Sequence, residues 1–302
     1  MESLFGTDFA TWLDLKLFQM PAQLAIGVVN GAFYAMLSLG LAVIFGLLNI
    51  VNMAHGAQFM MGAFAAWMLL TWFGIGYWPA LLLAPLLVGA IGVLLEKLFI
   101  SRLYKLDHLY GLLLTFGLAL IIEGVFRNYF GSSGLPYQVP PSLRGATDLG
   151  FMSMPNYRIW VVVSALVLCL GTWLLIEKTR LGAYLRAATE NAALVQAFGV
   201  NVPRMVTLTY GAGVALAAIG GVLAAPIYSV NPQMGSNLII VVFAVVVIGG
   251  MGSILGSVLT GFGLGIVEGL TKVFWPEASA TVIFVIMAIV LLARPAGLFG
   301  RA

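Results

Sequence analysis

The chain has 302 residues, of which 62% are hydrophobic, 12% aromatic and only 8% charged. A soluble domain is usually about 45–50% apolar and about 25% charged. Asp, Glu, Lys and Arg are all absent from Leu17 to Leu95 and again from Met205 to Val267. These stretches exclude a water-soluble globule. Because a chain inside lipid must satisfy its own backbone hydrogen bonds, they predict an all-α integral membrane protein.

Net charge, the first residues and the cysteine count exclude further classes. The chain has 14 Lys and Arg against 11 Asp and Glu, a net charge of +3, and no basic cluster, which favours membrane orientation over nucleic-acid binding. The first 20 residues hold three acidic residues and one lysine, so a cleavable signal peptide is not expected. Cys169 is the single cysteine, which excludes an intrachain disulfide.

Nine apolar segments follow one another along the chain and predict a polytopic helix bundle of eight or nine transmembrane segments. One of them, Leu238 to Gly249, is too short to cross unaided, so it either joins its neighbour through glycines or dips in as a re-entrant half-helix. We expect a single transmembrane domain over residues 1–302. The nine segments are Leu24–Leu48, Ala57–Ile75, Ala80–Ile100, Leu109–Phe130, Ile159–Ile176, Met205–Tyr228, Leu238–Gly249, Leu255–Val273 and Ala280–Leu292.

Lysine and arginine in short loops predict the orientation of the bundle, because they concentrate on the cytoplasmic side. Three groups belong there on this rule, which places residues 178–204 in the cytoplasm and residues 131–158 outside. The groups are Lys97, Arg102 and Lys105; Lys178, Arg180, Arg186 and Arg204; and Arg294 and Arg301. Five basic residues fall on the opposite side: Lys16, Arg127, Arg144, Arg158 and Lys272.

The outer loop of residues 131–158 contains four prolines and four glycines. This composition predicts a shaped cap and not a packed domain. The loop is either a solvated connector or a docking surface for a partner outside the membrane.

Catalytic and metal sites are not expected on this chain. A P-loop is absent, the two histidines His55 and His108 lack HExxH spacing, and the predicted spans contain no aspartate. Two carboxylates qualify as buried charges in the predicted spans, Glu123 and Glu268, and each stands four positions before a basic residue. This spacing predicts ion pairs at the outer helix ends, where the basic side chain reaches the lipid headgroups. A proton relay would need an unpaired, central carboxylate.

Two polar breaks interrupt the uncharged stretches, one from Gly46 to Gly62 and one from Ile248 to Gly256. Backbone without regular structure is tolerated in a membrane only where protein buries it or a watery cavity reaches it. Matching breaks in two halves of a chain indicate a site between repeats, whereas plain helix packing is the alternative explanation. The candidate residues are Asn49, Asn52, His55 and Gly56 in the first break, with Gln58 nearby, and Gly250, Gly252 and Ser253 in the second.

Small residues at helical spacing predict close helix contacts. Gly27 and Gly31 form one such pair, and Gly261, Gly265 and Gly269 form a second series.

The connection from Thr179 to Arg204 predicts a helix at the membrane face. Arg186 and Glu190 lie on a different face from its apolar positions, and Gly199 and Pro203 supply the helix stop and a turn. Such a helix either packs on its own bundle or binds a soluble partner. The apolar positions are Leu181, Leu185, Ala188, Ala192 and Val195.

Together these segments resemble the permease subunits of ATP-binding-cassette importers of the branched-chain amino acid type, from about Gln23 to Gly300. The segment from Gly46 to Gly62 is similar to the family's G-I-x-N-F-A-H-G motif, and the ending from Arg294 to Gly300 is similar to its R-P-x-G-L-F ending. Arg180 to Pro226 and Ile248 to Glu268 also fit. Many relatives have an acidic residue directly after the His-Gly pair, where this chain has Ala57.

The resemblance implies an alternating-access permease domain in a bacterial-type inner membrane. The implied partners are two ATPase subunits that bind ATP and Mg, a second permease and a periplasmic binding protein, with no cofactor on this chain. The implied translocation pathway is Asn49, Asn52, His55, Gly56, Gly250, Gly252 and Ser253. The implied ATPase-docking residues of a cytoplasmic coupling helix are Gly182, Arg186, Ala187, Glu190, Asn191, Gly199 and Val200.

Two other classes stay open from the residues alone. A secondary transporter of amino acids or metabolites would need no ATPase and would use a coupling-ion site, usually a central carboxylate. A structural membrane protein would explain the hydrophobicity, although not the two polar breaks or the alanine-rich cytoplasmic helix.

Overall fold

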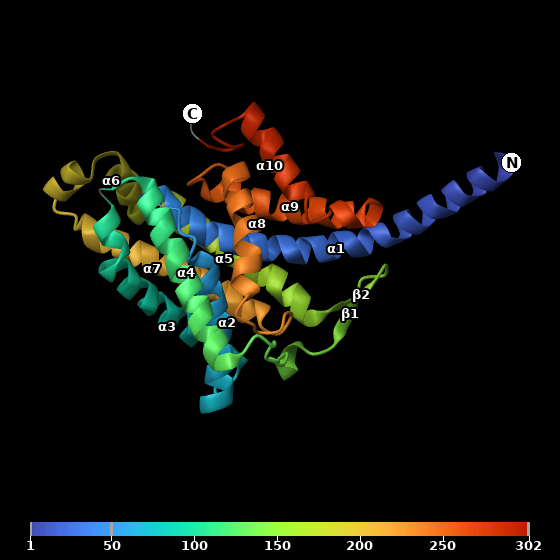
Figure 1. Cartoon of the computed structure of the whole chain (residues 1–302), viewed down its shortest axis with the longest axis horizontal. Helices are drawn as coiled ribbons and strands as arrows, with labels where there is room; N and C mark the ends of the chain where they lie inside the picture. Colours follow the sequence, from blue (N-terminus) through green and yellow to red (C-terminus); the bar gives the residue numbers. More distant parts are fainter. Residues whose placement is uncertain (1, 49–50, 105, 301–302) are drawn as a thin grey trace.

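The computed structural model describes residues 2–48, 51–104 and 106–300. Within those ranges the chain is almost entirely helical, with one small hairpin in the longest connection (Figure 1). The α-helices are α1 (Glu2–Leu48), α2 (His55–Phe73), α3 (Tyr77–Leu98), α4 (His108–Phe130), α5 (Asn156–Lys178), α6 (Arg180–Ala197), α7 (Val202–Ala224), α8 (Met234–Gly249), α9 (Ile254–Phe274) and α10 (Val282–Ala293). Short 3-10 turns are η1 (Ile100–Leu103), η2 (Pro141–Leu143) and η3 (Pro276–Ala278).

Each of the nine predicted apolar segments overlaps a helix of its own, although four of them extend past a helix end by two to four residues. Among the described residues, seven helices are long and apolar enough to cross a membrane, and α8 and α10 are shorter apolar helices of 16 and 12 residues. At about 1.5 Å per residue α8 spans roughly 24 Å, less than a bilayer core. Residues 250–253 separate α8 from α9, so the two do not join into one helix. The chain is therefore a multi-pass helical membrane protein with broken helices.

The first helix is much longer than its apolar segment predicts. It begins at Glu2 instead of Leu24, and Figure 1 shows its N-terminal part projecting beyond the other helices. Side chains on this projecting part are exposed, among them Phe9 (63%) and Phe18 (82%).

Glycines hold α1 against α9: the two glycine series whose spacing predicts close helix contacts pack against each other. A Cβ atom at Gly27 would lie 2.5 Å from the carbonyl oxygen of Gly265, and one at Gly31 would lie 3.1 Å from that of Gly261. Because lipid removes the hydrophobic drive between helices, such close backbone contacts and their dispersion energy become the main source of association.

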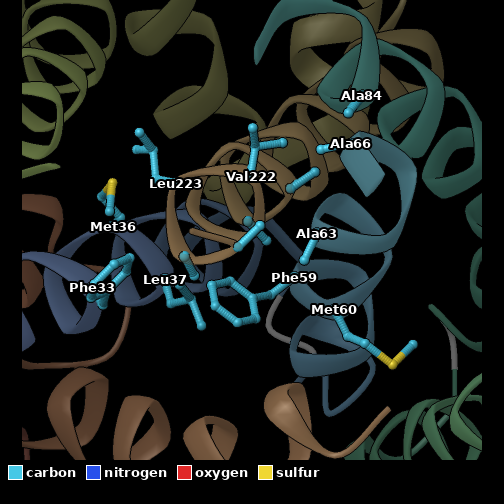
Figure 2. Packing of buried hydrophobic residues seen from close by; sticks show 14 of the residues in the cluster. Phe33, Met36, Leu37, Phe59, Met60, Ala63, Ala66, Ala84, Val222 and Leu223 are labelled. Carbon is cyan, nitrogen blue, oxygen red and sulfur yellow. The ribbon is translucent and has the colours of Figure 1, made fainter. Parts of the chain in front are cut away.

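The largest buried cluster lies where α1, α2 and α7 meet (Figure 2). Phe59 from α2 lies beside Leu37 from α1, and Gly220 on α7 leaves room for both. Phe33, Met36, Met60 and Phe64 are likewise almost completely buried. This cluster fixes the start of α2 relative to α1.

The loop of residues 131–158, which we call the outer loop after its predicted side, is a shaped connection and not a packed domain, as its composition predicts. Its strands β1 (Ala146–Asp148) and β2 (Ser153–Pro155) pair antiparallel, with Ala146 opposite Pro155. Leu135 exchanges two backbone hydrogen bonds with Val230, which ties the loop to the connection between α7 and α8.

One end of the bundle holds Lys97, Arg186 and Arg204, which belong to the first two basic groups on which the predicted orientation depends. Two neighbouring cavities there share α6 as a wall; one also touches Lys97 and Arg204, and the other touches Arg186 and Gly300. We call this end, which holds α6, the end of α3 and the segment 294–300, the α6 end. Lys105 and Arg301 lie outside the described residues.

Candidate functional site

The first polar break is buried in protein. Residues 51–54 have no regular structure, and Thr115 of α4 satisfies their backbone: its hydroxyl accepts from the amide of Met53 and donates to the carbonyl of Val51, each at 3.1 Å. The Asn52 side-chain oxygen accepts from the amide of Ala54 at 3.1 Å. The chain therefore interrupts its helix here without leaving these backbone groups unpaired, which a membrane interior requires.

Asn52 joins a buried polar cluster with two other side chains. The amide groups of Asn52 and Gln58 both donate to the Tyr210 hydroxyl, each at 3.1 Å, and Asn52 also donates to the Gln58 oxygen at 3.3 Å. All three side chains are at most 1% exposed. This cluster links the break to the middle of α7.

His55 and Gly56 lie at the start of α2, against other helices. The His55 Nε2 lies 3.1 Å from the carbonyl oxygen of Leu37, so Nε2 carries the hydrogen. His55 Nδ1 is buried and has no hydrogen-bond partner among the described residues. A Cβ atom at Gly56 would lie 2.6 Å from the carbonyl oxygen of Gly235 on α8. Asn49 lies outside the described residues.

The second break contacts α1 at a different level. Gly250 and Gly252 have positive φ angles, and a Cβ atom at Gly252 would lie 3.0 Å from the Cα of Gly46. Ser253 caps α9, since its hydroxyl accepts from the amide of Gly256 at 3.1 Å. Gly252 and Ser253 line a cavity of about 460 Å³ at the α6 end.

The structure thus brings together Asn52, His55 and Gly56, and separately Gly250, Gly252 and Ser253. The first group meets α1 near Leu37 and the second meets it at Gly46, nine residues or roughly 14 Å further along the helix axis. A small cavity of about 50 Å³ borders Gly56, with room for about one or two waters. The first break is therefore closed in this conformation.

The helix predicted from Thr179 to Arg204 is present, but it is not one straight helix. Asn191 has φ −150° and ψ 90°, which divides α6 into two helical pieces. Leu185 and Val195 are buried as the apolar stripe predicts, whereas Leu181 is 41% exposed and Ala192 is also exposed. The stripe is therefore only partly covered by this chain, and the kink at Asn191 separates Ala192 from the helical piece that holds Leu181 and Leu185.

The residues predicted to dock an ATPase divide between the surface and the interior. Ala187, Glu190, Asn191 and Gly199 are exposed. Gly182 is buried with its Cα against the Ile176 carbonyl of α5, where no Cβ atom would fit, and half-buried Val200 packs on the cluster around Leu185. Three apolar side chains of the same region are also exposed, and the sequence analysis did not single them out: Tyr184, Leu194 and Phe198.

Arg186 contacts α5 across the start of α6. Its guanidinium donates to the Ile176 carbonyl at 3.2 Å and to the Glu177 carboxylate at 3.3 Å. Its side chain is still 41% exposed. Part of the polar face predicted from Arg186 and Glu190 therefore binds α5 of the same chain.

The predicted ion pairs are both present. Arg127 donates to Glu123, and Lys272 donates to Glu268 at 2.5 Å. Glu268 also accepts from the Tyr34 hydroxyl at 2.7 Å, which joins its helix to α1.

The prediction that these two are the buried carboxylates is wrong, because Glu96 in the last turn of α3 is only 1% exposed. The Tyr104 hydroxyl donates to its Oε1 at 2.5 Å. Burial, and then this neighbouring carboxylate, raise the pKa of Tyr104 far above its usual range, so the phenol is a neutral donor. Glu96 lies near the end of the predicted segment Ala80–Ile100, and the sequence analysis did not single it out.

Metal ligation is not indicated: within the described ranges, no group of three His, Cys, Asp or Glu side chains lies close enough to hold an ion.

Helices long and apolar enough to cross a membrane, with a polar break between α1 and α2 and another between α8 and α9, define a polytopic helical membrane protein. A family model described as "Branched-chain amino acid transport system / permease component" matches residues 23–292, and the chain belongs to this family. It is 29% identical to the high-affinity branched-chain amino acid transport system permease protein BraD of Pseudomonas aeruginosa, over 95% of this chain and 97% of BraD.

Two further relatives come from one organism, Escherichia coli K12. The corresponding permease protein LivH is 30% identical over 92% of this chain and 95% of LivH, and LivM is 28% identical over 92% of this chain and 71% of LivM. A solved structure, PsaBC from Streptococcus pneumoniae in complex with Fab, aligns at 12% identity over 94% of each chain with a TM-score of 0.48.

Proposed function

We propose that this chain is the membrane-spanning permease subunit of an ATP-binding-cassette importer for branched-chain or other small neutral amino acids. The observation that carries the proposal is the family match over residues 23–292, together with full-length relatives whose names give that substrate class. The placement of Asn52, Gln58 and Tyr210 inside the bundle supports it, because a neutral polar cluster suits a zwitterion that must be released after passage.

Transport proceeds by alternating access in this proposal. Asn49, Asn52, His55 and Gly56 line the pathway, with Gly250, Gly252 and Ser253 at its cytoplasmic end. The conformation in which the first break is closed is one of two states of the transport cycle in this proposal. The states that open inward and outward differ in how α2 and α8 pack around Gly56 and Gly235.

The α6 end faces the cytoplasm in this proposal, and residues 131–158 face the periplasm of a bacterial-type inner membrane. Two ATPase subunits bind ATP and Mg and dock on the exposed part of α6. A second, different permease completes the pair, which the similarity to both LivH and LivM supports. A periplasmic binding protein delivers the substrate to the outer loop.

The experiment that tests the proposal is an affinity pull-down of the tagged chain from native membranes in mild detergent, with mass spectrometry of the partners. Recovery of ATPase subunits and a second permease supports the importer. In parallel, leucine uptake into proteoliposomes is compared with internal ATP and with a proton gradient alone. Uptake that needs only the gradient, without ATPase recovery, assigns the chain to the secondary carriers.

A further inference from the structure

A carboxylate borders the small cavity at the first break. This cavity of about 50 Å³ lies between the start of α2, the later half of α4 and the start of α8, and its lining includes Gly56, Ala57 and Glu123. Arg127 donates to Glu123 Oε1, whereas Oε2 accepts no hydrogen bond within the described ranges. The Glu123 side chain is 15% exposed and its Oε2 is not fully buried, so a ligand can reach this oxygen.

The second ion pair of the same spacing differs in this respect. Both carboxylate oxygens of Glu268 are occupied, because Oε1 accepts from Lys272 and Oε2 accepts from the Tyr34 hydroxyl. Glu123 has only Arg127, whose side chain is 48% exposed and donates through a single nitrogen to the described part of the chain. The pair on α4 therefore presents an unoccupied carboxylate oxygen and unoccupied guanidinium N–H groups next to each other.

The surface onto which this pair opens is polar. Gln233, Ser236 and Asn237 at the start of α8 are exposed, and Ser236 lines the cavity. Gly235, which lies between them, packs on Gly56 of the first break and so places them within the depth of the bundle. Exposed amide side chains at that depth are costly in lipid. This face therefore meets water or protein in the membrane.

We propose that Glu123 and Arg127 bind the head group of the transported amino acid at the mouth of this cavity. The ammonium group donates to Glu123 Oε2, and the carboxylate accepts from the remaining N–H groups of Arg127. Because the two side chains touch, both charges of one α-amino acid can reach them together. This proposal rests on the proposed function and deepens it, since it assigns the residues that recognise the substrate.

A zwitterion fits this pair better than a simple ion does. A cation alone would be repelled by Arg127 and an anion alone by Glu123, whereas an amino acid carries both charges. The closed cavity has room for about one or two waters, so the apolar side chain of the substrate enters when α2 and α8 separate. The apolar residues that then form its wall are Phe116, Leu120 and Ile239.

The test is protection of a thiol in this cavity by L-leucine, in native membranes that hold the chain with its partners. Ser236→Cys supplies the thiol, N-ethylmaleimide labels it, and mass spectrometry reads the label at position 236, while the native Cys169 is buried. Labelling is measured with and without ATP, because the cavity opens in one state of the cycle.

Leucine should slow the labelling in at least one of these conditions. Leucinamide lacks the carboxylate and 4-methylpentanoate lacks the ammonium. Each should need about tenfold higher concentrations or more for the same protection, because each loses a hydrogen bond between charged groups. Leucine that slows labelling in neither condition, or that protects no better than both analogues, overturns the site.

Glu123→Gln keeps the shape of the side chain but removes its charge. In this variant leucine should protect no better than 4-methylpentanoate, because the ammonium has lost its charged partner. The matched control Glu268→Gln makes the same change in the other ion pair, and leucine should keep its advantage there. If Glu123→Gln weakens leucine and 4-methylpentanoate by the same factor, Glu123 has only a structural role and the proposal is wrong.

Leucine uptake by the chain with its native Ser236 separates this inference from the proposed function. Uptake that needs ATP and the binding protein, combined with labelling that leucine does not slow, overturns only the site at Glu123. A preparation that takes up no leucine under any condition overturns the proposed function.

Discussion

Gly27 of α1 and Gly265 of α9 touch backbone to backbone, since a Cβ atom on Gly27 would lie 2.5 Å from the Gly265 carbonyl oxygen. The contact continues along both helices, with Gly31 facing Gly261 and Gly269 facing Gly27. The pairing of α1 with α9 is more extensive than that of any other two helices. These glycines thus set the distance between α1 and α9, both of which line a cavity at the α6 end.

The first prediction concerns this contact. Gly265→Val should destabilise the protein by about 2 kcal/mol or more, because the new side chain must push against the Gly27 backbone, which cannot rotate away. The melting temperature of the detergent-solubilised protein measures the loss. Gly263→Val on the same helix is the matched control, since a Cβ atom there meets nothing within 4 Å. Equal melting temperatures for the two variants would contradict the role of the contact.

The second prediction tests the buried polar cluster. Tyr210→Phe removes the acceptor shared by Asn52 and Gln58 and leaves buried amide donors unpaired, which should destabilise the protein by about 1–3 kcal/mol. Thermal unfolding and leucine uptake are both measured. Uptake should fall further than the loss of folded protein explains, because the cluster lies at the proposed pathway.

The control for that variant is Tyr137→Phe in the outer loop. Burial raises the pKa of Tyr137 to about 12, so its phenol stays neutral, and its hydroxyl is buried without a hydrogen-bond partner in the described part of the chain. Removing it should change stability by less than about 0.5 kcal/mol. Stability losses of the same size in both tyrosine variants would mean that the Asn52 and Gln58 contacts contribute little.

Hydropathy and small-residue spacing predicted most of the fold. Uncharged stretches must lie in lipid, and glycines four apart let helices approach closely there, so the helices and the presence of close contacts at both glycine series were predictable. The spacing did not predict that the two series pack against each other. The start of α1 was not, because Glu2 to Gln23 carries charges and interrupts the apolar pattern that marks a span.

The candidate site was predictable only in part. The break at Asn52 showed in the sequence, but Tyr210 lies 158 residues away on an apolar helix, and no local pattern links the two. Glu96 stands next to Lys97 after a long uncharged stretch, which is typical of a loop boundary. It is buried because η1 turns back and places Tyr104 over it. The kink at Asn191 was missed because helical periodicity counts positions and does not register a single residue with extended backbone.

The third prediction concerns Arg186. Arg186→Glu should abolish ATP-dependent uptake and leave membrane insertion intact, because the exposed pair with Glu177 is worth at most about 1 kcal/mol of stability. Uptake, ATPase recovery on pull-down and the amount of protein in the membrane are measured together. The double variant Arg186→Glu with Glu177→Arg restores the internal pair with reversed charges. ATPase recovery should stay low in the double variant; full recovery would show that Arg186 acts only within this chain.

The fourth prediction concerns the segment 294–300, which closes the end of α8. The amides of Leu298 and Phe299 donate to the carbonyls of Ile248 and Gly249 at 2.8 and 3.1 Å, which satisfies acceptors that a helix end leaves free. Gly297 has φ +81°, and a Cβ atom on it would lie 2.6 Å from the Cα of Gly250. The segment can therefore approach the second break this closely only with glycine at position 297.

Gly297→Ala should consequently lower the melting temperature and reduce uptake, because it adds both backbone strain and a clash with the break that holds Gly252 and Ser253. The strain alone costs about 1 kcal/mol or more. Gly150→Ala separates the two effects, since Gly150 has φ +83° in the outer hairpin and nothing within 4 Å of a Cβ atom. If both variants lose the same stability and both keep full uptake, the contact between Gly297 and Gly250 contributes nothing beyond the strain, and the segment does not support the second break.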